Sequence, residues 1–133
     1  MSIDRVAVRL QSPSLPVASL TEIAGRPATR STHRGTPVSS RRPEGPSHEV
    51  STVLFEQHGT WDTLDGFVDA IGGLLDRIAT AETEFGELQV DLIVKITARP
   101  LGYMVELGAD HLERLRAANC GIVFDVYSSI DDH

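Results

Sequence analysis

The chain has 133 residues, of which 41% are hydrophobic, with one cysteine and a formal net charge of −7. This length suits one domain that can bury a core without disulfides or metals, and a single cysteine excludes an intrachain disulfide. The acidic balance argues against nucleic acid as the main partner, because phosphates would be repelled. The first residues lack secretory features and no apolar run is long enough to cross a bilayer. We therefore expect a cytoplasmic protein with no membrane partner.

The first third of the chain predicts a strand, a short helix and a long loop. Residues 5–10 alternate apolar and polar side chains, as a half-buried strand does. Pro16 suits the first turn of a helix with Ser14 as its cap, and Gly25 suits a left-handed helix end. Residues 26–48 are rich in Pro, Gly and Ser without apolar periodicity, which indicates a loop. So long a loop in one domain is unusual, and it is functional, partly disordered or contains a short strand.

Charge is distributed unevenly along the sequence. Five arginines and no acid lie between residues 26 and 42, which leaves seven of the twelve basic residues with all 19 acids elsewhere. We therefore expect a basic loop beside an acidic body.

The strongest helical pattern covers residues 62–80, where apolar residues follow the three-four spacing of one helix face. Asp62 is a natural cap. Gly72 and Gly73 lower helix propensity, and we interpret them as a point of close approach to the sheet. The predicted buried face consists of Leu64, Phe67, Val68, Ile71, Leu74, Leu75 and Ile78.

Strands are predicted before and after this helix. Residues 51–55 indicate one strand, and residues 88–97 alternate clearly between an apolar and a polar face. Residues 103–107 are interpreted as a short additional strand. Since one face of the clearest strand is polar, we expect a sheet with one covered face.

A helix and a strand close the sequence. Residues 110–118 predict a short helix with Leu112 and Leu115 facing inward, and Asn119 suits a left-handed cap. Residues 120–127 predict the last strand. The fold class is therefore α+β: a mostly antiparallel sheet with two or three helices packed on one face, a ferredoxin-like or related two-layer sandwich. We expect a single domain over residues 1–133, with the basic loop at 26–48 and a frayed tail at 128–133.

Two stretches carry a family resemblance. SLTEIAGRPATRSTHRGTP supplies Gly25, Pro27 and Arg34-Gly35, and VDLIVKI with LGADHLERLRAANCGIVFDVY ends in Asp125 and Tyr127. In these motifs the chain resembles, over nearly its whole length, the bacterial family catalogued as domain of unknown function 4279. The resemblance implies a small bacterial cytosolic protein with no settled activity, from genes sometimes found in toxin-immunity neighbourhoods. The family usually has Gly in place of Asn119, and a tryptophan usual in its second strand is not matched here.

The sequence offers no catalytic or cofactor motif. No phosphate-binding glycine pattern is present, and none of the five histidines has metal-ligand spacing to another His or Cys. Cys120 lies in the apolar register of the last strand, which favours an inert thiol over a nucleophile. We therefore expect a protein that is not an enzyme and that has no cofactor and no metal.

Two sets of charged residues are candidates for binding. Arg30, His33, Arg34 and Arg41 would converge with Lys95 to hold an anion or small ligand, because arginine binds carboxylate and phosphate in a bidentate manner. The alternative for these residues is a flexible solvated loop.

The second set consists of acids on the outer face of the long helix. Asp62, Asp65, Asp69 and Asp76 would form a docking surface for a basic partner. The alternative for this set is an ordinary solvated helix face.

Two functional hypotheses follow from these sets. The first is a non-catalytic protein-binding module, such as an immunity or regulatory protein that binds and masks a partner, for example a toxin encoded nearby. The second is a small-ligand or anion-binding domain that uses the basic loop. A homodimer, joined through a strand edge or a sheet face, is compatible with either.

Overall fold

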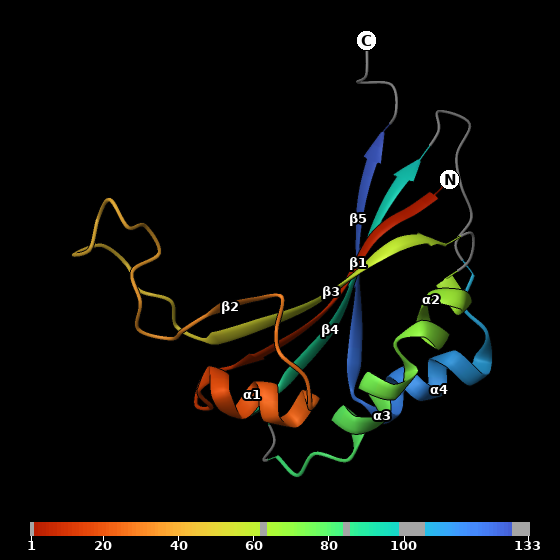
Figure 1. The fold of residues 1–133 in the computed structure, drawn as a ribbon, viewed down its shortest axis with the longest axis horizontal. Coiled ribbons are helices and arrows are strands. Elements are labelled where there is room, and N and C mark those ends of the chain that lie inside the picture. Colours follow the sequence, from red (N-terminus) through yellow and green to blue (C-terminus); the bar gives the residue numbers. More distant parts are fainter. Residues whose placement is uncertain (1, 62–63, 84–85, 99–105, 129–133) are drawn as a thin grey trace.

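The protein is a two-layer sandwich of a five-stranded sheet and helices (Figure 1). This computed structural model describes residues 2–61, 64–83, 86–98 and 106–128. The described strands are β1 (Ser2–Ser12), β2 (Arg30–Thr32), β3 (Ser51–Trp61), β4 (Gln89–Ala98) and β5 (Cys120–Ser128). The described helices are α1 (Val17–Ala24), α2 (Leu64–Ala70), α3 (Gly72–Ala79) and α4 (Ala109–Ala117).

The strands lie in the order β2-β3-β1-β4-β5. Neighbouring strands are antiparallel except for β4 and β5, which are parallel because α4 returns the chain to the same end of the sheet. The predicted α+β class, with a mostly antiparallel sheet, is confirmed. The described part of the chain contains no helix of the length and apolar character that a membrane span requires.

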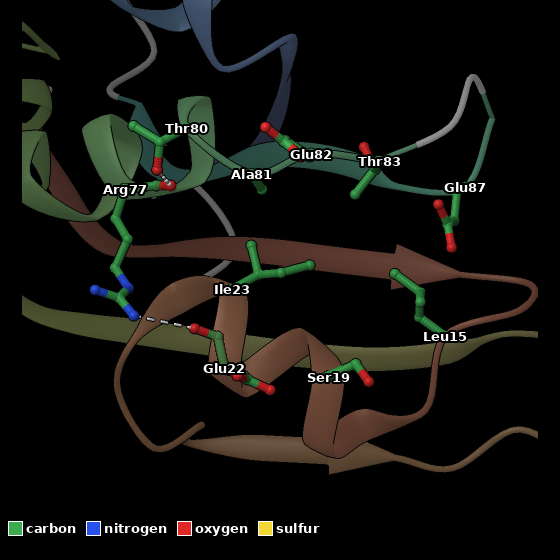
Figure 2. Close-up of a pocket in the computed structure, with 10 residues that line it drawn as sticks. All are labelled: Leu15, Ser19, Glu22, Ile23, Arg77, Thr80, Ala81, Glu82, Thr83 and Glu87. Carbon is green, nitrogen blue, oxygen red and sulfur yellow. Dashed lines mark hydrogen bonds between the residues drawn. The ribbon is translucent and has the colours of Figure 1, made fainter.

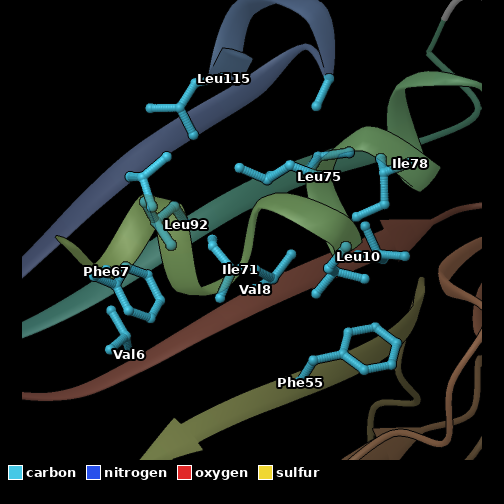
Figure 3. Packing of buried hydrophobic residues seen from close by; sticks show 14 of the residues in the cluster. Val6, Val8, Leu10, Phe55, Phe67, Ile71, Leu75, Ile78, Leu92 and Leu115 are labelled. Carbon is cyan, nitrogen blue, oxygen red and sulfur yellow. The ribbon is translucent and has the colours of Figure 1, made fainter. Parts of the chain in front are cut away.

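The hydrophobic core lies between one face of the sheet and the helices (Figure 3). Val6, Val8 and Leu10 on β1 are fully buried and lie beside the apolar face of β4. The seven apolar residues predicted for the long helix are all buried against them, with Phe67 and Leu75 among the most enclosed. Alternation in the strands and three-four spacing in the helix therefore predicted the correct faces.

The predicted single helix over residues 62–80 is two helices. The chain turns at Ile71 (φ −99°, ψ 7°) between α2 and α3. The low helix propensity of Gly72 and Gly73 accounts for a break at this point. Ile71 N–H still bonds to the Phe67 carbonyl at 3.1 Å, and Leu75 N–H to the Ile71 carbonyl at 3.1 Å. Helical phase is thus preserved, and both segments keep their apolar residues on the core side.

Two details of helix packing differ from prediction. Gly72 approaches α4 rather than the sheet, because a Cβ there would meet the Arg114 guanidinium at 2.5–2.6 Å. Leu112 is 51% exposed instead of inward-facing, while Leu115 is buried as predicted. Helix α4 is therefore rotated so that Leu115 and Ala118 form its contact with the core.

The start of α1 also differs from prediction. Pro16 is the N-cap itself, and no side chain caps the helix. The Ser12 hydroxyl instead accepts hydrogen bonds from the N–H groups of Ser14 and Leu15, at 3.2 and 2.8 Å, which turns the chain after β1. The helix ends at Gly25 with φ 71°, and α4 is followed by Asn119 with φ 51°. The predicted left-handed conformations at these two positions are confirmed.

The predicted loop at 26–48 contains the short strand β2, which pairs with β3. Asp62, the predicted cap, lies outside the described residues, as do most of the predicted strand at 103–107 and the tail from 129 onward.

We expect Gly25→Ala to lower the free energy of unfolding by about 1–2 kcal/mol, because a side chain is strained in the left-handed region. The added Cβ would also overlap the Arg77 guanidinium. Urea unfolding measures the change. Gly73→Ala is the matched control, since space around Gly73 is open and alanine favours a helix; it should be neutral or stabilising. Equal losses in the two variants would contradict this account.

Candidate functional site

The segment between β2 and β3 forms a projecting arm, which we define as residues 33–48. Figure 1 shows the arm extending away from the helices. The N–H groups of Gly35 and His48 bond to the carbonyls of His48 and Thr36, each at 2.9 Å, and Val38 N–H bonds to the Pro46 carbonyl at 2.9 Å. These cross-links make the arm an irregular two-stranded finger.

The far part of the arm carries unpaired positive charge. Arg41 and Arg42 are exposed, and neither forms an ion pair in the described part of the chain. A hydrogen bond from Arg42 N–H to the Ser39 carbonyl, at 3.1 Å, closes a turn that contains Arg41. Val38, on the same arm, is 59% exposed. The arm therefore presents two guanidinium groups and an apolar side chain to solvent.

The base of the arm is bonded to the rest of the domain. Arg30 Nε lies 3.5 Å from Glu56 Oε1, and the Glu56 side chain is only 10% exposed. The Arg34 guanidinium donates to the Pro13 carbonyl, and Arg34 N–H donates to the Ser51 hydroxyl at 3.3 Å. Arg30 and Arg34 therefore anchor the arm instead of extending its free charge.

The structure does not bring the predicted anion-binding set together. Lys95 lies on β4, which is separated from β2 and the arm by β1 and β3. Its Nζ lies over the Tyr127 ring, 4.4 Å from the centroid. His33 is exposed at the base of the arm, and Arg41 lies in its far part. These side chains share no concavity with Lys95.

The three described acids of the predicted acidic surface pair with groups of α4. Asp65 Oδ1 accepts a hydrogen bond from Gly108 N–H at 2.9 Å, at the start of α4, and lies 3.3 Å from His111 Nδ1. His111 Nε2 lies 2.8 Å from Asp69 Oδ1. Each nitrogen of the His111 ring therefore faces a carboxylate of α2.

The third described acid of this set makes a bidentate pair. Arg114 Nε and Nη2 donate to the two oxygens of Asp76 at 3.1 and 2.9 Å. The hydrogen bond from Arg114 holds the pKa of the Asp76 carboxyl below its usual 3.8, and the same bond raises the pKa of Arg114.

Asp65, Asp69 and Asp76 thus connect α2 and α3 to α4. We call these three acids, together with His111 and Arg114, the α4 clamp. Asp62 lies outside the described residues. The two basic partners, His111 and Arg114, were not predicted, although their three-residue spacing places them on one face of α4.

The helix side contains a groove of about 440 Å³ between α1 and the chain after α3 (Figure 2). Figure 2 shows Arg77 reaching from α3 toward α1, where its Nη2 donates to the Glu22 carbonyl at 3.3 Å. Glu22, Glu82 and Glu87 also line the groove. Three carboxylates beside one guanidinium disfavour an anionic ligand here.

The sheet face opposite the helices carries a polar network. Asp91, which is buried, accepts hydrogen bonds from Arg9 Nη2 and Gln89 Nε2, each at 3.0 Å. Cys120 lies on the other side of the sheet, in register with Val90 and packed against the core. Burial, and then the nearby Asp91 carboxylate, raise the pKa of the Cys120 thiol to about 12. Thiolate is therefore scarce at neutral pH, which disfavours a nucleophilic role for Cys120.

Among the described residues, no three His, Cys, Asp or Glu side chains are placed to hold a metal ion. No family model, curated protein or solved structure matches the chain. The resemblance to domain of unknown function 4279 therefore stays a prediction.

We expect the urea midpoint of Asp76→Asn to lie below that of the wild type at pH 7, because the pair with Arg114 is lost. The folded pKa of Asp76 is lowered, so its stabilisation is complete above 3.8 and is lost as pH falls through the folded value. The difference in urea midpoint between the wild type and Asp76→Asn should therefore disappear at acidic pH. Glu113→Gln, which removes an exposed pair with Arg116, is the control and should change little. A gap that persists in acid would contradict the assignment.

Proposed function

We propose that this protein is a non-catalytic binding module that docks on an acidic surface of another protein through the arm. One observation carries the proposal: Arg41 and Arg42 are exposed and unpaired on a projecting finger, while the acids of α2 and α3 are engaged with α4. Arginine binds carboxylates in a bidentate manner, and opposite charges speed encounter.

The chemistry of the arm favours a protein partner over a nucleic acid. Residues 33–48 contain no aromatic side chain on which a base could stack. The body also carries the net negative charge of the chain and would repel phosphates. Exposed Val38 gives the arm an apolar contact beside its charges, as interfaces commonly have.

An immunity or regulatory role, in which binding masks a partner such as a toxin encoded nearby, is the specific form of this proposal that the family resemblance implies. The arm, in place of the acidic helix face, would then make the contact. The single cysteine suits a reducing compartment such as the cytoplasm.

The alternative of a small-ligand or anion site on the basic segment has less support. Arg30 is paired with Glu56, Arg34 donates to a backbone carbonyl, and Lys95 stacks on Tyr127 two strands away from β3. A ligand could reach Arg41 only on an exposed finger, where water competes for each contact.

The test is parallel affinity capture from the source cells with the wild type, Arg41→Glu/Arg42→Glu and the control Arg116→Glu, followed by quantitative mass spectrometry. We expect one stoichiometric protein to be captured by the wild type and the control and lost from the arm variant. The purified partner should bind the arm variant at least about tenfold more weakly, and the wild type more weakly as salt is raised.

Two results would count against the proposal. One is a partner that binds the arm variant as tightly as the wild type, which would place the contact elsewhere. The other is the absence of any stoichiometric partner in all three captures when the neighbouring gene products are co-expressed.

A further inference from the structure

Strand β5 forms an edge of the sheet over its whole length, Cys120–Ser128. Within the described residues β4 is its one partner strand, so its outer row of backbone N–H and C=O groups has no strand to pair with. Such a row is a template for a further strand.

The two edges of the sheet differ in how they are protected. β2, at the opposite edge, has three residues and leads directly into the arm. β5 has nine residues, CGIVFDVYS, without proline or lysine. Its one charged side chain, Asp125, accepts a hydrogen bond from the Tyr127 hydroxyl at 2.9 Å. β5 therefore lacks the usual devices that keep an edge from pairing.

Apolar side chains of β5 are exposed on both faces of the sheet. Phe124 and Val126 lie on the helix side, in register with buried Val94 and Ile96, yet they are 47% and 42% exposed. Val123 and Tyr127 alternate with them on the other face and are 41% and 46% exposed. A helix or a flat surface would cover one face only, whereas an added strand with its own side chains covers both.

We propose that β5 pairs antiparallel with β5 of a second copy of this chain, across a two-fold axis perpendicular to the sheet. In an antiparallel pair, residues directly opposite each other lie on the same face of the sheet. The two-fold axis therefore passes between one residue and the same residue of the second copy. An axis at Phe124 sets Phe124 against Phe124, Val126 against Ile122, and Tyr127 against Gly121. The two Asp125 carboxylates are then not opposite each other.

The size of this contact is compatible with a reversible dimer. Nine residues span roughly 30 Å of edge at about 3.4 Å each. With side chains on two faces, the two copies would bury on the order of 1,000 Å² in total, at the lower limit of specific interfaces. The joined sheets would carry the two arms at opposite ends, because each arm follows the other edge strand, β2. The inference does not depend on the proposed function.

The first test is sedimentation of the purified full chain over a concentration series. We expect the mass to rise from 14.5 kDa toward twice that value as concentration reaches the order of 100 μM. Phe124→Lys and Val123→Lys, which alter opposite faces of β5 at partly exposed positions, should each remain monomeric. Val38→Lys, at an exposed apolar residue on the arm, is the matched control and should dimerise like the wild type.

The second measurement is hydrogen exchange of β5 backbone amides at low and high protein concentration. Exchange in residues 120–128 should slow as the dimer forms, while exchange in the arm should not change. A wild type that stays at 14.5 kDa would overturn the proposal and leave the edge to a different partner. A dimer that survives both lysine substitutions, or that leaves β5 exchange unchanged, would overturn it as well.

Discussion

The placement of α4 depends on charged pairs with α2 and α3. Leu115 is the buried apolar residue within α4, and it is supported by Ala118 immediately after the helix. The carboxylates that pair with His111 and Arg114 add polar contacts that help to orient α4 on α2 and α3. Since α4 connects β4 to β5, the α4 clamp also sets where the last strand enters the sheet.

The clamp changes which surfaces remain for partners. Asp65, Asp69 and Asp76 pair with groups of α4, and the arginines at the base of the arm are likewise bonded to the rest of the domain. Arg41 and Arg42 on the arm and the apolar side chains of β5 are left exposed. These surfaces lie at opposite edges of one sheet, so a partner protein and a second copy of the chain could bind without competing for space.

Local pattern predicted the buried faces, because burial follows the period of each element. Alternation identified the core side of β1 and β4, and three-four spacing identified the core residues of α2 and α3 through the break at Ile71. The sequence could not show that Asp76 meets Arg114, 38 positions away, because that contact depends on how the helices pack. The prediction that Leu112 faces inward was wrong for the same reason. β2, with three residues, is too short for a period to be visible.

The pairing of the α2 and α3 carboxylates with α4 is the interaction that most needs a direct test. The most direct measurement is a pH titration of the side-chain carboxyl carbons of the folded protein by NMR. The account predicts an Asp76 midpoint below 3.8 in the wild type that returns toward 3.8 in Arg114→Gln. An Asp76 that titrates at its ordinary value in both proteins would show a solvated, unpaired carboxylate and would contradict the account.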